Sequence, residues 1–484
     1  MGSNIWYVPG LEPRDPVTQV AYAQTSREEL PPAGSASSSG SSPLVKDEKH
    51  PVRAAKEDHA TRRTYKQLAK DREAFIKAVV VAAPRQNLWV SWLRSASVER
   101  LKFQATFIEL FFDRQGSRFP GFEYILRSAD QNSALITSLD AICLVHVGTA
   151  HSDERLLEAA RMTYGSAVAK VRREILASRR DDSFLVAAVY LLTICEFFSA
   201  TAAPDKGWRR HIRGIMQLLG SLDLAKLDPS IRILVGTLLR GPAVWNSICE
   251  RKSLPGITNI QRALDDGTTF SSSTDFIKLA VRVPSMIEKV DLLCHARTRG
   301  EMVETSSVVD CCWDIVALGD ELGAWMNAWY DTLDETPFQV IPISILSTNK
   351  ADLTTQDTVF PIGYRFSTPL LAPKHRSYWA CRLSLHQAHL ELFEAYPERI
   401  SEQPADNGQE ARITEKAMQC ADDLCMTVAF DTQPENGYVA LFSAMVPLEL
   451  AAAWYKRQNH QAKLEWCRQA MKIFRAAGLQ TSQL

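Results

Sequence analysis

Residues 181–220 read DDSFLVAAVYLLTICEFFSATAAPDKGWRRHIRGIMQLLG. The first half of this stretch, residues 183–199, is apolar on every side of a helix, which indicates a helix at the centre of a bundle. Asp181 and Asp182 precede it, where acidic groups favour a helix amino terminus. Glu196 is its only strongly polar interior residue. The stretch therefore predicts a helical body packed around one buried helix.

The sequence on both sides repeats the spacing of amphipathic helices. Apolar residues recur at steps of three and four from Leu135 to Cys143 and again from Leu157 to Ile175. The same pattern predicts further helices at 208–219, 231–250, 274–297, 301–330, 374–396, 411–430, 438–456 and 461–477. Prolines and β-branched residues in 337–373 favour an irregular connection with a short strand pair. We therefore expect an all-α fold, a large irregular multi-helix domain.

Composition divides the chain of 484 residues into three parts. Residues 1–51 contain the tract PPAGSASSSGSSP and predict a disordered leader. Residues 52–96 predict a basic helical linker, because the stretch 46–103 carries 14 Lys and Arg against 7 Asp and Glu. Residues 97–484 are expected to form the helical domain.

The overall charge and the cysteines exclude several classes of protein. A net charge of −1 gives no global attraction to nucleic acid or to an anionic membrane. The longest apolar run, 184–195, falls well short of the ~20 residues that cross a bilayer, so no membrane segment is expected. The ten cysteines begin at Cys143 and include no Cys-x-x-Cys pair, which excludes a local thiolate zinc module and favours a reducing compartment.

No common catalytic motif is present: the chain lacks G-x-G-x-x-G, a P-loop, G-x-S-x-G and H-E-x-x-H. His386 and His389 lie three residues apart on a predicted helix, with Glu394 further on, a spacing that suits two ligands of a metal. Because no third ligand is identifiable, we interpret both histidines as partly exposed polar residues of an amphipathic helix. Two cysteine pairs are interpreted as small buried residues, namely Cys311 with Cys312 and Cys420 with Cys425. No catalytic residue, cofactor or metal ligand is therefore assigned.

Four residues form a tighter group beside the buried helix. Trp208 and His211 are three residues apart, which places the indole and the imidazole near one helix face, and Gly214 follows one turn later. We expect Glu196 to accept a hydrogen bond from Trp208 or His211, because a buried carboxylate without a partner is costly. Gly214 is expected to permit the close approach of another helix. We interpret the group as structural.

This region resembles the helical regulatory region of fungal zinc-cluster transcription factors, the fungal-specific transcription factor domain. In that family an apolar helix ending near a glutamate is followed by the order W-x-x-H-x-x-G, and the matching positions here are Glu196, Trp208, His211 and Gly214. The later segment NGYVALFSAMVPLELAAAWY is similar to the apolar helix that closes the family's domain. The resemblance implies a domain that acts through contacts with other transcription proteins or with a homo- or heterodimer partner.

The chain departs from the family at its beginning. Family members carry six closely spaced cysteines that bind two zinc ions, whereas this chain has no cysteine before Cys143. Contact with DNA is therefore left open. The resemblance implies a nuclear transcriptional regulator, not an enzyme, of a type that often accompanies metabolic or secondary-metabolite gene clusters. Two alternatives stand beside it: a helical co-regulator without DNA contact of its own, and an all-helical metal-dependent enzyme that uses His386 and His389.

Overall fold

The structure is a computed structural model, in which the chain divides into two units, residues 1–96 and 97–484. It describes residues 97–112, 120–176, 181–198, 207–270, 273–346, 359–400 and 408–480, all of them in the second unit. The disordered leader expected at 1–51 and the basic helical linker expected at 52–96 lie outside the described residues.

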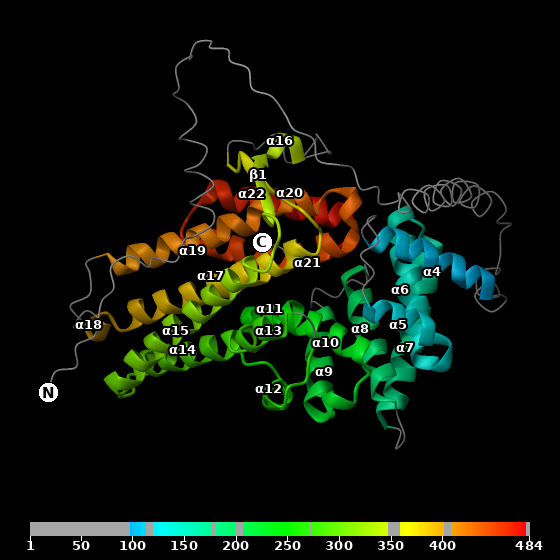
Figure 1. Cartoon of the computed structure of the whole chain (residues 1–484), viewed down its shortest axis with the longest axis horizontal. Helices are drawn as coiled ribbons and strands as arrows, with labels where there is room; N and C mark the ends of the chain where they lie inside the picture. The colour runs from blue at the N-terminus through cyan, green and yellow to red at the C-terminus, as the bar shows by residue number, and fades with distance from the viewer. Residues whose placement is uncertain are drawn as a thin grey trace, which may run out of the picture. The chain divides into compact units, whose positions relative to one another are not determined.

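The described part of the second unit is all-α apart from one strand pair, as the helical spacing predicts (Figure 1). Its first helices are α4 (Ser97–Phe111), α5 (Pro120–Ser128), α6 (Ser133–His151), α7 (Glu154–Leu176), α8 (Asp182–Phe198) and α9 (Gly207–Ser221). Its middle helices are α10 (Pro229–Arg240), α11 (Pro242–Glu250), α12 (Ile257–Asp265), α13 (Thr274–Ala280), α14 (Val283–Thr298) and α15 (Thr305–Tyr330). Its last helices are α16 (Ile343–Leu346), α17 (Leu371–Ala395), α18 (Pro397–Ile400), α19 (Gln409–Met426), α20 (Val428–Asp431), α21 (Gly437–Arg457) and α22 (Gln461–Ala476). Short 3-10 turns are η1 (Ala129–Gln131), η2 (Leu224–Lys226) and η4 (Pro434–Asn436).

Helix α8 is the buried helix that the sequence predicts. It packs against α6, α7, α9 and α10. Every side chain from 185 to 198 is buried except two, Tyr190 and Glu196, which are half-buried. These two residues lie on an otherwise apolar helix, so each is expected to contact polar groups or a cavity next to the core.

The second half of the unit is built around α17. Helices α14, α15, α19 and α21 all contact it, and α14, α15, α17 and α19 run side by side (Figure 1). Helix α21 also contacts α4 and α11. Because α4 packs against α6 and α11 against α9, the late apolar helix links the helices around α8 to α17 through these two neighbours.

Two of the predicted helices are broken in the structure. The helix predicted at 231–250 ends at Arg240, and α11 begins at Pro242, because Gly241 leaves the helical conformation and proline has no N–H to continue the ladder. The helix predicted at 274–297 is divided between α13 and α14 just before Pro284, although Val281 and Arg282 between them keep a helical backbone. Helix α12 occupies a segment for which no helix was predicted.

The short strand pair expected in 337–373 is confirmed. Strands β1 (Phe338–Pro342) and β2 (Ile362–Phe366) pair antiparallel, with Phe338 opposite Phe366. Both rings lie within 5.3 Å of the His375 ring on α17, measured between ring centroids. The strand pair thus covers one end of α17 with aromatic side chains.

Two described helices, α6 and α21, are long and apolar enough to span a membrane by length and composition. In the folded unit 72% and 61% of their apolar windows are buried. Because the core helices of a soluble protein have the same character, these two helices are weak evidence for a membrane protein.

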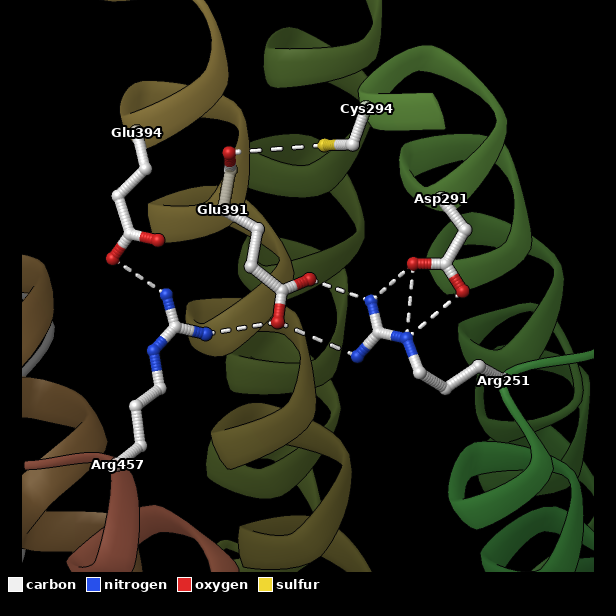
Figure 2. A network of polar contacts seen from close by, with 6 residues as sticks. All are labelled: Arg251, Asp291, Cys294, Glu391, Glu394 and Arg457. Carbon is white, nitrogen blue, oxygen red and sulfur yellow. Dashed lines mark hydrogen bonds and ion pairs between the residues drawn. The ribbon is translucent and has the colours of Figure 1, made fainter. Parts of the chain in front are cut away.

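A polar network joins four helices of the second unit (Figure 2). Arg251 ends α11 with a left-handed backbone, φ 54°, and its guanidinium contacts Asp291 of α14 at 2.6 Å and Glu391 of α17 at 2.5 Å. Arg457 at the end of α21 contacts the same Glu391 at 2.8 Å and Glu394 at 2.7 Å. Because both arginines share one carboxylate, the network fixes α11, α14, α17 and α21 in one arrangement.

Candidate functional site

Two of the four residues singled out by the resemblance, Glu196 and His211, form a polar cluster with Tyr164 between α7, α8 and α9. Tyr164 of α7 donates its hydroxyl hydrogen to the Glu196 carboxylate, and its oxygen lies 2.6 Å from Nε2 of His211. A tyrosine hydroxyl has one hydrogen, so His211 Nε2 must be the donor to the Tyr164 oxygen. His211 Nε2 itself is 3.7 Å from Oε1 of Glu196. Burial and the neighbouring carboxylate raise the pKa of Tyr164 well above its ordinary value.

The expected partner of Glu196 is therefore corrected in part. The sequence predicts a hydrogen bond from Trp208 or His211; in the structure Tyr164 donates to Glu196, and His211 contacts the tyrosine hydroxyl and lies 3.7 Å from the carboxylate. Trp208 stacks on Phe197 instead, with ring centroids 4.7 Å apart and planes 26° apart. Its contribution in this contact is to apolar packing on α8.

The expected close approach at Gly214 is wrong. A Cβ atom added at Gly214 would meet nothing within 4 Å, because this face of α9 is exposed. An added Cβ atom would meet a close neighbour at two other positions of the segment, a side-chain oxygen at one and backbone at the other. A Cβ at Gly207 would lie 2.1 Å from Oε2 of Glu196, and one at Gly220 would lie 2.8 Å from Cα of Gly256. The close glycine contacts of the segment therefore lie at its two ends and not at Gly214.

The two histidines on α17 are more enclosed than the sequence suggests. His389 is buried, His386 is half-buried, and burial lowers the pKa of His389 to about 4 and that of His386 well below its ordinary value. Glu394 contacts Arg457, as described above. Within the described ranges no group of three or more His, Cys, Asp or Glu side chains is placed to hold a metal ion. The interpretation as partly exposed residues of an amphipathic helix is therefore wrong for His389.

The cysteines singled out in the sequence are free thiols. Cys311, Cys420 and Cys425 are buried, as expected, whereas Cys312 is half-buried. Cys425 Sγ lies 3.7 Å from Sγ of Cys467 on α22. Burial raises the pKa of the Cys311 thiol to about 11 and that of Cys312 to about 12, which keeps both in the unreactive thiol form.

The other half-buried residue of α8, Tyr190, faces a cavity of about 110 Å³. Helices α4, α5, α8, α10, α11, α17 and α21 contribute to its wall, which is mostly apolar. Aromatic side chains form much of the lining, namely Phe111, Phe112, Phe122, Trp245 and Phe442. Sequence analysis did not find the cavity, because its wall is assembled from segments that are far apart in the chain.

The polar side chains of the cavity wall fall into two sets. Four of them already donate hydrogen bonds to backbone carbonyls, namely Thr237, Ser377, Asn436 and Ser443. Tyr190, Arg240 and Trp245 form the second set. Trp245 has a buried indole N–H without a hydrogen-bond partner. The charged and polar groups that act on Arg240 and Tyr190 are each other, a second arginine and Lys374, with no carboxylate among them in the described part of the chain.

The second arginine, Arg376 of α17, is a buried cation that has a carboxylate partner. Its guanidinium contacts both carboxylate oxygens of Asp431, at 2.5 and 2.6 Å, and also donates to Ser443 in the cavity wall. Arg376 is 1% exposed and Asp431 is fully buried. Burial raises the pKa of Asp431 to about 6, and the neighbouring guanidinium opposes that rise. Arg376 is thus neutralised within the protein, whereas Arg240 is not.

None of the protein-family models, curated proteins or solved structures compared with the chain matches it.

Proposed function

We propose that the chain is a nuclear transcriptional regulator whose helical domain acts by binding other molecules and not by turning over a substrate. The observation that supports this best is the polar cluster at the end of α8. The residues that carry the family resemblance, Glu196 and His211, contact Tyr164 and hold three helices together. None of the three belongs to the wall of the cavity. They therefore serve the architecture of a regulatory domain.

The proposed partners are other transcription proteins or a second subunit. The basic stretch 52–96 is the segment through which the chain would contact DNA phosphates, because it carries the local excess of Lys and Arg. The proposed setting is a metabolic or secondary-metabolite gene cluster.

The test is a tethering assay with the full chain. The chain is fused to a heterologous DNA-binding domain, and the expression of a reporter gene with matching sites is measured. We expect the fusion to raise or lower the reporter relative to the DNA-binding domain alone. A fusion that accumulates in the nucleus and leaves the reporter unchanged would contradict the proposal.

Two variants of α9 make the assay specific for the folded domain. Ile212 is 1% exposed, so Ile212→Asp places a charge in the core and should abolish the effect. Gln217 is exposed on the same helix, so Gln217→Asp adds the same charge at the surface and should leave the effect intact. Equal behaviour of the two variants would show that the effect does not come from the helical domain.

Binding to labelled duplex DNA at several salt concentrations separates a direct regulator from a co-regulator. A direct regulator loses affinity steadily as salt rises, because each phosphate contact releases counterions. A co-regulator shows no measurable binding at any salt concentration. Metal analysis of protein purified without chelator addresses the enzyme alternative, and stoichiometric zinc, iron or manganese would contradict the proposed function.

A further inference from the structure

The cavity beside α8 combines an apolar wall with unused hydrogen-bond donors. Tyr190 contributes a hydroxyl and Arg240 a guanidinium, and neither has a hydrogen bond to a described residue, whereas the unpartnered indole nitrogen of Trp245 in the same wall is covered by its neighbours. The guanidinium is a donor only, and the hydroxyl is able to donate. The wall has neutral acceptors, the oxygens of Thr237, Ser377, Asn436 and Ser443, but no described carboxylate pairs with Arg240.

Positive charge is in excess around the same space. Lys374 of α17 lies close enough to Arg240 for the two charges to repel, and its ammonium sits 4.8 Å from the centre of the Trp329 ring. Arg376 adds a third cation, which Asp431 neutralises. Neither Lys374 nor Arg240 has an ion pair with a described carboxylate. An anion in the cavity would offset this imbalance, because unpaired buried charge is costly.

We infer that the cavity binds a small molecule made of an apolar body and a single carboxylate group, with Arg240 as the counter-ion. A carboxylate accepts hydrogen bonds and donates none, which suits the donors of Arg240 and Tyr190. Its two oxygens match the paired N–H groups of a guanidinium. The aromatic side chains leave the rest of the molecule in an apolar setting, so the body of the ligand is a ring system or a short hydrocarbon chain.

The volume limits the size of this ligand. The cavity measures about 110 Å³, somewhat below the roughly 150 Å³ of an apolar protein cavity that takes up benzene. A one-ring acid matches this scale, a two-ring acid fits with one ring inside and the other in the open side, and most of a long fatty acid would lie outside the cavity. The inference goes beyond the proposed function, because binding is measured on the purified chain without DNA or reporter.

The test compares two probes of the same shape, 2-naphthoate and the uncharged 2-naphthamide, by isothermal titration calorimetry with the full chain. We expect 2-naphthoate to bind at least about tenfold more tightly, a difference of about 1.4 kcal/mol. Absence of saturable heat with 2-naphthoate, or equal affinity for the two probes, would overturn the inference. Tighter binding of 2-naphthyl phosphate than of 2-naphthoate would overturn the assignment of a carboxylate.

Variants then locate the binding site. Arg240→Met keeps the length of the side chain and removes its charge, so the preference for 2-naphthoate should fall to within about twofold while 2-naphthamide binds as before. Arg155→Met at an exposed position of α7 makes the same exchange away from the cavity and should leave the preference intact. Tyr190→Phe removes only a hydroxyl and should weaken 2-naphthoate more than 2-naphthamide. A preference that survives Arg240→Met would place the acid elsewhere, and melting curves of each variant establish that it is folded.

Discussion

Replacing each of the two arginines beside the cavity by methionine should change the stability of the chain in opposite directions. Arg376→Met leaves the carboxylate of Asp431 fully buried without its partner. Removing one member of a buried ion pair costs about 3–5 kcal/mol. We therefore expect Arg376→Met to lower the free energy of unfolding by that amount at neutral pH.

Arg240→Met removes a cation that the protein does not neutralise. Burial lowers the pKa of Arg240 from 12.5 to about 10. At about 1.4 kcal/mol for each pKa unit this corresponds to roughly 3 kcal/mol, and water in the open cavity reduces it, so we expect a gain of about 1–3 kcal/mol. Methionine keeps most of the apolar stem contacts of arginine, so little packing is lost.

Thermal melting followed by far-ultraviolet circular dichroism measures both effects on the purified, ligand-free chain. For a unit of this size 1 kcal/mol shifts the midpoint by roughly 1 °C, so we expect a fall of about 3–5 °C for Arg376→Met and a rise of about 1–3 °C for Arg240→Met. The double variant Arg376→Met with Asp431→Leu removes both charges and should recover most of the loss.

The pH dependence of the Arg376→Met variant gives an independent check. The pKa of Asp431 is already raised to about 6, and loss of the guanidinium that opposes this rise takes it higher. A carboxyl group whose pKa is raised by folding contributes stability at low pH and loses it as the pH rises through the folded-state value. The deficit should therefore be smaller at pH 5.5 than at pH 8. Destabilisation by Arg240→Met, or a deficit in Arg376→Met that does not change with pH, would refute the reasoning.

Three further predictions concern the polar cluster, the glycines of α9 and the stability of the chain at acidic pH. Glu196→Ala should lower stability by about 1–3 kcal/mol, because the Tyr164 hydroxyl loses its acceptor, and an unchanged melting curve would remove the cluster as a source of stability. Gly220→Ala should destabilise the fold because its Cβ would lie 2.8 Å from the backbone of Gly256, whereas Gly214→Ala should stabilise it by about 0.5–1 kcal/mol at an open helical position; melting of the two variants side by side checks both signs. Stability should also fall as the pH drops from 6.5 toward 4, because neutral buried histidines must gain a proton on unfolding, and a flat stability profile over this interval would contradict the pKa values of about 3, 4 and 4 for His146, His375 and His389.

The sequence predicts the fold class well because helical periodicity is a local signal. The apolar circumference of 183–199 indicates a buried helix, and α8 is buried along almost its whole length. Prolines and β-branched residues indicate the strand pair, which α16 and a further connection separate in the chain. Helix ends are predicted less well: the apolar spacing continues across Gly241 and Pro242, so the break between α10 and α11 was missed.

Partners across the fold are predicted poorly, because spacing within one segment carries no information on which other segment faces it. Glu196 stands out as an acid on an apolar helix, but its donor, Tyr164, lies 32 residues earlier on α7. The glycine expected to permit a close approach is exposed, and two other glycines of the same segment make the contacts. The chemistry of a single residue was visible in the sequence, and its neighbour was not.

The missed break and the missed cavity have the same cause. Arg240 is the last residue of α10, and a continuous helix over 231–250 would carry the chain straight on beyond it. Gly241 and Pro242 end that helix, and the cavity is lined by Arg240, Gly241, Pro242 and Trp245. No described carboxylate pairs with Arg240 there. From the sequence, an arginine at the carboxyl end of a helix is expected to interact favourably with the helix dipole. Once the break is known, Arg240 is seen to be a cation in an apolar cavity. Its positive charge then indicates that the ligand is an anion.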